Sequence, residues 1–554
     1  MMRFYKEDYY MKKKQLIKVL SVLFAVTIPA GMFCVTANAA EYDPDTFVAG
    51  EAPVQGDDND LPSSYSSVEQ GYVTDIKNQR YNDCWAYSTL AALESKLLKE
   101  GYQTENMNES HLNLWAMTRS DGNGWVRSYT GAGLVYTGSG YLTSWQGGVL
   151  ISDIGDYPLS SSVKGDEVPT DMARYGVTGI RYLAKEDPET VKRVLYQNGG
   201  AAIAFAYNST FLSSDGRSYY MPPTYNGSYV GHQVELIGWD DNYPAQNFSD
   251  QNGNCSDSDG AWLIKNSWGT GSGDQGFLWI SYNDKNVLHS RFAPNYSIES
   301  VLELDDTVSL LQNEIYGATY EFVYIKENDL TFINRFALDG KYDVLDKVVF
   351  ETECAGADYT LYLVPDDNGA PTSDTARWTK LSEGTVPYEG YICDDFADVA
   401  LSGDSISVAV RIDASSISKN ASVGVGEWLT SNSNYVFYNE SERGQSYLYR
   451  NGAVTDVMDY YEQELSDTMG GTLVIKGVVR KSGKPLYGDV NLDGRVDVTD
   501  ATAVQRYSAG LDGLTAEQLT AADVDGDGAV NVTDATQIQK FAAGLITRFP
   551  VEDQ

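Results

Sequence analysis

Hydrophobic and polar positions divide the chain into segments of different periodicity. After Cys84, apolar residues recur at every third or fourth position and predict an amphipathic helix that ends near Gly101. Two mostly apolar runs further along, Gln233–Trp239 and Ala261–Lys265, predict buried strands. We assign residues 61–299 to one domain that mixes helices and strands.

From residue 300 to residue 480 the pattern changes to short stretches in which apolar and polar residues alternate. Turn residues separate these stretches at fairly regular intervals, which is typical of all-β domains. The clearest stretches are Lys347–Glu351, Tyr359–Val364, Ser405–Ile412 and Gly471–Val479. The pattern predicts an antiparallel β-sandwich over residues 300–480, followed by a short linker at residues 481–486.

Residues 487–554 contain an internal repeat with a period of 34 residues. Asp489 corresponds to Asp523 in the second copy, and Tyr507 corresponds to Phe541. A short repeat of this kind indicates two copies of one small structural unit. We therefore assign these residues to a third, small domain.

The first 40 residues have the order of a secretory signal peptide. Basic residues at Lys12–Lys14 precede an apolar run at Val19–Phe33, and the small-residue sequence Ala37-Asn38-Ala39 follows. Residues 41–60 carry seven acids and no base, and we expect them to form an acidic leader. No other segment of the sequence is long and apolar enough to span a membrane, so we expect a secreted, extracellular protein without a membrane anchor.

The net charge of the sequence argues against two classes of binding partner. The 554 residues include 40 Lys and Arg against 78 Asp and Glu, for a formal net charge of −38. Such a charge argues against broad nucleic-acid binding and against docking on anionic lipid, because like charges repel. Five cysteines are too few for a disulfide framework in a chain of this length, and the sequence leaves open whether Cys354 and Cys393 pair.

The C-terminal repeat places oxygen-bearing side chains where a hard cation needs them. They occupy positions 1, 3, 5, 9 and 12 of a loop in each copy, with glycine at position 6 for a sharp turn. With one backbone carbonyl per loop, they approach the set of about six to eight oxygens that Ca²⁺ takes. The predicted ligands are Asp489, Asn491, Asp493, the carbonyl of Arg495, Asp497 and Asp500, and then Asp523, Asp525, Asp527, the carbonyl of Ala529, Asn531 and Asp534. The alternative is an acidic tail with chance spacing.

From Gly488 to about Leu545 this segment resembles a type I dockerin, the calcium-dependent module that docks enzymes on cohesins of scaffoldins in cellulosome-like complexes. The resemblance implies a small all-α domain with two F-hand repeats, two Ca²⁺ ions and a cohesin partner. It also implies two nearly identical sets of partner-binding side chains, which are Val498, Thr499, Gln505 and Arg506, and Val532, Thr533, Gln539 and Lys540. A structural calcium module without a cohesin partner is the alternative.

Cys84 begins the predicted helix of the first domain. The positive end of a helix dipole lowers a thiol pKa, and a thiolate is the nucleophile that amide hydrolysis needs. Taken alone, Cys84 could equally be a buried cysteine at the start of an amphipathic helix. Two other segments favour catalysis. His232 lies at the start of the segment Gly231–Asp240, which extends the predicted strand and would hold an imidazole rigidly, and Asn266, followed by Trp268, can orient that imidazole.

Cys84-Trp85-Ala86, His232 and Asn266-Ser267-Trp268 stand in the chain order of the papain-like cysteine peptidases, which the sequence resembles from about Leu61 to Asn283. The resemblance implies an α+β papain-like fold that hydrolyses proteins or peptides without a catalytic cofactor. By it, Cys84 is the nucleophile, His232 is the general base and Asn266 orients that base. Gln79 and the Cys84 backbone N–H would stabilise the oxyanion.

Two departures from the family pattern support another hypothesis. Gln79 lies five positions before Cys84, where the family has six, and Asp83 puts a negative charge beside the nucleophile, which opposes thiolate formation. The alternative is a catalytically degenerate papain-like scaffold that binds or regulates within the complex. A peptidoglycan amidase is a third candidate, against which the segment around Asn266 argues. Retention of all three catalytic residues favours the peptidase.

The middle domain resembles the lectin-like β-sandwich of certain secreted bacterial and archaeal peptidases. Its place after a papain-like domain and the segments Phe332–Phe336 and Leu345–Phe350 carry this resemblance. Exposed Tyr and Trp side chains on such a sandwich can stack on sugar rings, which makes a glycan ligand one expectation. More often such side chains belong to the core.

Overall fold

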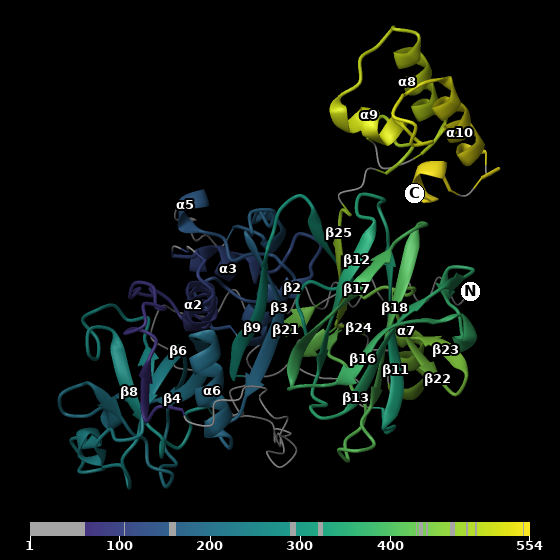
Figure 1. The fold of residues 1–554 in the computed structure, drawn as a ribbon. Helices are drawn as coiled ribbons and strands as arrows, with labels where there is room; N and C mark the ends of the chain where they lie inside the picture. The colour runs from purple at the N-terminus through teal and green to yellow at the C-terminus, as the bar shows by residue number, and fades with distance from the viewer. Residues whose placement is uncertain are drawn as a thin grey trace.

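The computed structural model describes residues 61–554 except 103, 105, 134, 155–161, 289–294, 319–324, 428, 432–435, 439–440, 466–470, 483–485, 493–495, 544, 547 and 554. The predicted signal peptide and acidic leader lie outside the described residues. The described residues form a part that mixes helices and strands, a part rich in strands and a small helical part (Figure 1). None of the described helices has the length and apolar character needed to cross a bilayer.

The first part is built around helix α2 (Cys84–Lys99), which is buried along most of its length. The helix packs beside strands β4 (Ala201–Tyr207) and β6 (Val230–Asp240). Strand β6 pairs antiparallel with β4 and with β7 (Ala261–Lys265), and β7 pairs with β8 (Phe277–Ser281). The helix predicted after Cys84 and both predicted strands are therefore confirmed.

Shorter elements surround this framework. The helices are α3 (Glu109–Trp115), α4 (Val135–Thr143), α5 (Ile151–Ile154) and α6 (Pro188–Asn198), with 3₁₀ turns η2 (Gly165–Glu167), η3 (Ser209–Phe211) and η4 (Ala245–Phe248). The remaining strands are β1 (Ser64–Ser66), β2 (Gly124–Trp125), β3 (Tyr175–Leu183), β5 (Ser218–Tyr219) and β9 (Asn295–Glu303). The mixture of a central helix, flanking helices and an antiparallel sheet gives this part its α+β character.

The strand-rich part is an antiparallel sandwich, as the alternating pattern predicted. One layer is the six-stranded sheet β16-β13-β18-β11-β22-β23. Its strands are β11 (Asp329–Ala337), β13 (Asp358–Val364), β16 (Thr379–Thr385), β18 (Ser405–Asp413), β22 (Ser446–Arg450) and β23 (Ala453–Asp456). The opposite layer contains β10 (Val308–Leu311), β12 (Val344–Thr352), β17 (Gly390–Ala400) and β25 (Ile475–Arg480). Large apolar side chains such as Phe332 and Phe350 fill the space between the layers.

Short elements complete this part. They are β14 (Asp366–Asp367), β15 (Ala370–Pro371), the 3₁₀ turn η6 (Thr375–Arg377), β19 (Val425–Glu427), β20 (Leu429–Ser431), β21 (Val436–Tyr438), α7 (Val457–Tyr460), the π turn η7 (Tyr461–Leu465) and β24 (Gly471–Leu473). Strand β21 pairs with β2 of the first part, so the two parts also meet in a small three-stranded sheet.

A continuous sheet joins the first two parts. Strand β17 of the sandwich pairs with β3 through Gly390 opposite Arg181 and Tyr391 opposite Ile180. The resulting order is β10-β25-β12-β17-β3-β9-β4-β6-β7-β8-β5, in a sheet of 12 strands that includes β1 (Figure 1). The change of pattern near residue 300 is therefore not a break in backbone hydrogen bonding.

The C-terminal part is a small all-α domain. It contains α8 (Val498–Ser508), α9 (Ala516–Ala522), α10 (Val532–Ala542) and the 3₁₀ turn η8 (Pro550–Asp553). Helices α8 and α10 have 11 residues each, and both begin with a capping box, formed by Asp497 with Asp500 and by Asn531 with Asp534. The 34-residue repeat of the sequence thus appears as two equivalent loop-helix units.

A buried carboxyl group lies at the junction of the first two parts. Glu351 of β12 is fully buried, and its carboxyl group accepts hydrogen bonds from the hydroxyl of Tyr182 on β3 and from the Ala318 N–H at 3.3 Å. Burial raises the pKa of Glu351 to about 7, against an ordinary value of 4.5. The folded junction therefore favours the protonated form of Glu351.

We expect the stability of the wild-type chain to fall with rising pH relative to Glu351→Gln. Between the ordinary pKa of 4.5 and the folded pKa of about 7, the folded state binds one more proton at this site than the unfolded state. The contribution is complete below the unfolded pKa and is lost as pH rises through the folded pKa, with a slope of at most about 1.4 kcal/mol per pH unit. Urea unfolding of both proteins across this range measures it. A difference in free energy of unfolding that is constant with pH would contradict the assignment.

Candidate active site

Cys84 is the first residue of α2, where the sequence placed it. Its N-cap is Asp83, whose side chain makes no capping hydrogen bond. Burial raises the pKa of the Cys84 thiol to about 11, the backbone N–H of Gln233 opposes that rise, and the Asp83 carboxylate adds to it. The sequence led us to expect a lowered pKa from the helix dipole. That expectation is wrong, because loss of water around the thiol outweighs the backbone N–H groups at the start of the helix.

His232 lies on β6, directly before Gln233. Its Nε2 is 2.9 Å from Oδ1 of Asn266, and since that oxygen accepts, Nε2 carries the proton and Nδ1 is left as an acceptor. The indole of Trp268 stacks on the imidazole with ring centroids 4.4 Å apart and planes at 14°. Burial lowers the pKa of His232 to about 4, although the hydrogen bond with Asn266 acts in the opposite direction. The structure therefore holds a neutral imidazole in one orientation.

Two hydrogen bonds connect Gln79 to the segment that carries Asn266. The Gln79 backbone N–H donates to the Ser267 carbonyl at 2.8 Å, and the Ser267 hydroxyl donates to Gln79 Oε1 at 2.5 Å. Gln79 Nε2 donates to the Tyr81 carbonyl at 2.7 Å. A carboxamide nitrogen carries two hydrogens, and Tyr81 uses one of them.

A cluster of buried charges lies beneath these residues. Lys77 Nζ is 2.7 Å from Glu94 Oε1 and 2.5 Å from Glu109 Oε1. Lys265 Nζ is 3.6 Å from Glu235 Oε2 and 4.0 Å from Glu94 Oε2. The side chains of Glu94, Glu235 and Lys265 are 0%, 1% and 5% exposed. We call these five residues the buried charge cluster.

The buried charge cluster connects the segments that carry the candidate site. Lys77 precedes Gln79 by two positions, and Lys265 directly precedes Asn266. Glu94 belongs to helix α2, which begins with Cys84. Glu235 belongs to strand β6, which also carries His232. Our sequence reasoning missed this cluster. The signal available was the presence of charged residues within otherwise apolar, buried elements.

Asp83 is enclosed beside the nucleophile. The residue is 3% exposed, its Oδ2 accepts from Asn113 Nδ2 at 3.2 Å, and its Oδ1 is buried without a hydrogen-bond partner. Burial raises the pKa of Asp83, while hydrogen bonds and Arg127 act in the opposite direction. Whenever this carboxyl group is ionised, it disfavours the Cys84 thiolate.

In the second C-terminal loop, carboxylates converge. One oxygen each of Asp523, Asp525 and Asp527 lies within 4.8 Å of the other two. Asp534 is fully buried, and its Oδ2 accepts from the Asn531 N–H at 2.8 Å. Burial raises the pKa of Asp534, and the charges of Asp525 and Asp523 raise it further. A divalent cation among these oxygens would relieve the repulsion, so the residues fit Ca²⁺. The Ala529 carbonyl accepts from the Asn531 amide at 2.9 Å.

The first C-terminal loop repeats the hydrogen bonds around the last aspartate of the loop. Asp489 and Asp500 are buried. Asp500 accepts from the Asn491 N–H at 3.0 Å and from the Asp497 N–H at 2.8 Å. The predicted ligands Asp493 and Arg495 lie outside the described residues.

The predicted partner-binding side chains share one property. All eight are exposed on α8 and α10, and they are Val498, Thr499, Gln505, Arg506, Val532, Thr533, Gln539 and Lys540. The two valines at the helix starts are 63% and 60% exposed, which is unusual for aliphatic side chains. Helices α8 and α10 therefore each present an exposed set of four of these side chains.

The other cysteines among the described residues are Cys255, Cys354 and Cys393, and none of the three is in a disulfide. Cys255 is exposed, and Cys354 and Cys393 are both free. The sequence left open whether Cys354 and Cys393 pair, and in this structure they do not.

Family models match all three parts of the chain. Residues 61–297 match the papain family cysteine protease model, residues 310–467 match the lectin like domain, and residues 487–541 match the dockerin type I domain. Among proteins, human cathepsin L2 is 27% identical over 242 residues, and a cysteine protease of Blomia tropicalis is 23% identical over 248 residues. These alignments cover 43% and 44% of this chain, and about two thirds of each relative, at 66% and 68%.

Two solved structures share both larger parts. The clostridial cysteine protease Cwp84 after propeptide cleavage is 32% identical with a TM-score of 0.66, over 76% of this chain and 100% of that one. A structure of the cysteine protease and lectin-like domains of Cwp84, a surface layer associated protein of Clostridium difficile, is 31% identical with a TM-score of 0.65, over 76% of this chain and 90% of that one. Fold and site together define a cysteine peptidase with a lectin-like domain and a dockerin. The chain belongs to the papain family of cysteine proteases.

We expect Asp83→Asn to lower the pKa of the Cys84 thiol, by up to about one unit, because it removes the nearest negative charge. Alkylation by iodoacetamide at neutral pH should accelerate by up to about tenfold, since the thiolate is the reacting form. The rate of alkylation against pH measures the shift. The exposed Asp75 provides a matched control, Asp75→Asn, which should leave the profile unchanged. If the pH profile of the alkylation rate were unchanged in Asp83→Asn, the Asp83 charge would have no effect on the pKa of the Cys84 thiol, and the prediction would be wrong.

Proposed function

We propose that the protein is a secreted cysteine endopeptidase that cleaves peptide bonds with Cys84, His232 and Asn266, and that its dockerin anchors it to cohesins of a cellulosome-like extracellular complex. One observation carries the catalytic part. The His232–Asn266 hydrogen bond lies beneath the Trp268 indole and leaves Nδ1 as an acceptor, on a strand whose next residue contacts the thiol of Cys84.

The proposed reaction begins with proton transfer from the Cys84 thiol to Nδ1 of His232. The sulfur then attacks the substrate carbonyl carbon, and the resulting oxyanion is stabilised by the Cys84 N–H, which lies at the start of its helix, and by the second N–H of Gln79 Nε2. His232 returns the proton to the leaving amine, which gives a thioester. Water, deprotonated by His232, hydrolyses the thioester and restores the thiol.

The alternative is a degenerate scaffold that binds without cleaving. The Asp83 charge and the short spacing from Gln79 to Cys84 favour it. The raised pKa of the thiol and the lowered pKa of the imidazole act in the same direction, because both disfavour proton transfer from sulfur to nitrogen. The intact contact between His232 and Asn266 supports a working site.

We expect an epoxide inhibitor of papain-like enzymes to add once to the wild-type chain and not to Cys84→Ala, with mass spectrometry as the measurement. Casein cleavage should be lost in Cys84→Ala, and in Asn266→Ala it should fall by at least about tenfold because the base is no longer oriented. Cys255→Ser, at an exposed thiol, is the matched control and should retain both properties. Absence of labelling and of Cys84-dependent cleavage would establish the scaffold, and cleavage of peptidoglycan alone would establish the amidase.

For the dockerin, we propose that it binds two Ca²⁺ ions, one in each loop. Asp523, Asp525, Asp527 and Asp534, with Asn531 and the Ala529 carbonyl, would hold one ion. The corresponding residues of the first loop would hold the other. Bound Ca²⁺ would neutralise the converging carboxylates and fix the start of α8 and α10. The exposed side chains of these helices would then present a rigid surface to cohesin, in either of two orientations.

We expect Asp525→Asn to weaken Ca²⁺ binding by at least about tenfold, because it removes one of three converging carboxylates. Calorimetry on the full chain carrying Cys84→Ala measures the affinity. Asp512→Asn, which removes an exposed carboxylate paired with Arg506, should leave Ca²⁺ affinity unchanged. Binding to a scaffoldin cohesin should be lost with chelator and return with Ca²⁺. Cohesin binding that is indifferent to chelator would refute the mechanism.

A further inference from the structure

One loop of the catalytic part begins in a strand that pairs with the lectin-like domain. In β2, Trp125 stands opposite Phe437 of β21, and Figure 1 shows both strands at the boundary between the two parts. The Trp125 side chain is buried in the hydrophobic core, and its carbonyl accepts from the Thr118 hydroxyl at 3.0 Å. Residues 126–133 follow directly, and we call them the junction loop. The loop therefore starts from a point that both parts fix.

Arg127 holds the junction loop in place. Its Nε, Nη1 and Nη2 atoms donate to the backbone carbonyls of Ala132 at 3.2 Å, Asn113 at 2.9 Å and Gly131 at 2.7 Å. Its guanidinium carbon lies 5.0 Å from the centre of the Trp85 ring, which directly follows the proposed nucleophile. The planar guanidinium can donate to several fixed acceptors at once, which the ammonium of lysine cannot reproduce in the same geometry. One side chain thus ties the loop to helix α3 and to the start of α2.

The junction loop also contacts the residues that precede the nucleophile. The Tyr129 carbonyl accepts from Asn113 Nδ2 at 2.9 Å, and the same nitrogen donates to Asp83 Oδ2 at 3.2 Å. The Tyr129 and Tyr81 rings meet edge to face with centroids 5.3 Å apart. The Tyr81 carbonyl in turn accepts from Gln79 Nε2 at 2.7 Å. The loop therefore supports both the N-cap of the catalytic helix and the side chain assigned to the oxyanion.

We propose that Arg127 is a positioning residue of the peptidase site, and that the lectin-like domain, through β21, holds the loop that Arg127 fixes. This inference rests on the proposed function, which assigns Gln79 Nε2 to the oxyanion. That contact forms in the transition state and not with bound substrate. Release of the junction loop would free the Tyr81 carbonyl, which orients Gln79. Loss of Arg127 should therefore lower kcat and leave KM nearly unchanged.

The electrostatic effect of Arg127 on the nucleophile has the opposite sign. The Arg127 charge opposes the burial that raises the pKa of Asp83, so its removal should raise that pKa further. A less ionised Asp83 disfavours the Cys84 thiolate less. Alkylation of Cys84 by iodoacetamide needs the thiolate but no oxyanion donor, so loss of Arg127 should not slow it. Peptide hydrolysis needs both, and the two rates should diverge.

The test measures cleavage of fluorescently labelled casein by the full chain, with the concentration of sites set by complete labelling with the epoxide inhibitor. In Arg127→Gln, kcat per site should fall by at least about tenfold, KM should change by less than about twofold, and the iodoacetamide rate should not fall. Arg127→Lys, which keeps the charge and loses the planar set of donors, should show the same loss of kcat.

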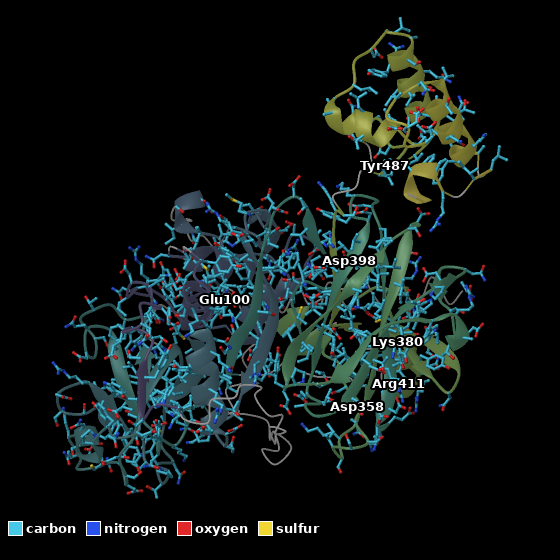
Figure 2. The ribbon with its side chains drawn as sticks, viewed as in Figure 1. Glu100, Asp358, Lys380, Asp398, Arg411 and Tyr487 are labelled. Atoms are coloured by element: carbon cyan, nitrogen blue, oxygen red, sulfur yellow. The ribbon has the colours of Figure 1, made fainter. Side chains whose placement is uncertain are left out.

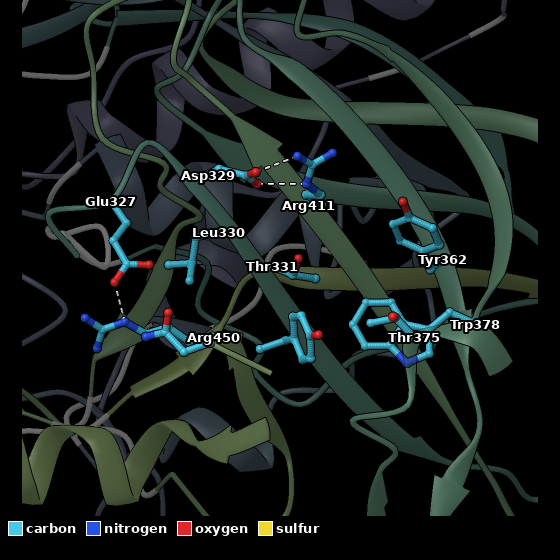
Figure 3. Close-up of a pocket in the computed structure, with 11 residues that line it drawn as sticks. Glu327, Asp329, Leu330, Thr331, Tyr362, Thr375, Trp378, Arg411 and Arg450 are labelled. Atoms are coloured by element: carbon cyan, nitrogen blue, oxygen red, sulfur yellow. Dashed lines mark hydrogen bonds and ion pairs between the residues drawn. The ribbon is translucent and has the colours of Figure 1, made fainter. Parts of the chain in front are cut away.

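Arg411→Gln is the matched control. Arg411 lies on β18 of the lectin-like sandwich, where its Nε is 2.8 Å from Asp329 Oδ1 (Figure 3). Figure 2 shows Arg411 well apart from Glu100, which follows α2 in the catalytic part. The control should therefore leave kcat, KM and the alkylation rate unchanged.

Phe437→Pro tests the contribution of the lectin-like domain. Strand β21 lies between β2 and β20, and proline has no N–H for either neighbour. We expect kcat to fall by at least about threefold. The double variant with Arg127→Gln should be no more than about twofold slower than the slower single variant, because both changes release the same loop. Thermal unfolding verifies that each variant is folded.

The outcomes separate this proposal from the proposed function. Unchanged kcat in folded Arg127→Gln, or a raised KM with unchanged kcat, would overturn the role of Arg127. A parallel fall in the alkylation rate would place the defect at the nucleophile and would also overturn it. Unchanged kcat in folded Phe437→Pro would overturn the contribution of the lectin-like domain. All of these results leave the peptidase assignment intact, whereas a wild-type chain without Cys84-dependent cleavage would refute that assignment and this inference with it.

Discussion

Burial of charge beneath the candidate active site is the constraint on which the rest of the catalytic part depends. Each ion taken out of water costs several kcal/mol unless a partner compensates it. Glu94 is fully buried, with Lys77 at 2.7 Å and Lys265 at 4.0 Å, so these segments can reach their burial only together. The helix of Cys84, the loop of Gln79 and the strand before Asn266 are thereby held in one arrangement. Loss of a single partner would leave an uncompensated buried charge.

The second constraint is the shared sheet. Pairing of β17 with β3 makes the lectin-like domain a structural continuation of the catalytic part. The fully buried Glu351 contacts both strands through Tyr182 and Tyr391, so the junction contains polar groups that must stay matched.

Periodic patterns predicted most of the elements correctly. The helix after Cys84, the strands that carry His232 and precede Asn266, and the alternating strands of the sandwich all have local signals in the sequence. The shared sheet has none, because the pairing of Gly390 with Arg181 joins segments that are distant along the chain. The raised pKa of Cys84 was missed for the same reason, since the helix dipole is a local property whereas burial depends on the whole fold.

The central claim is that Cys84 is the nucleophile of a working peptidase site. A crystal structure of the chain with a peptide aldehyde tests it directly, because the aldehyde forms a hemithioacetal that mimics the tetrahedral intermediate. Our account predicts a bond from Cys84 Sγ to the aldehyde carbon, with the former aldehyde oxygen facing the Cys84 N–H and Gln79 Nε2. An adduct on another cysteine, or an oxygen turned away from both donors, would contradict it.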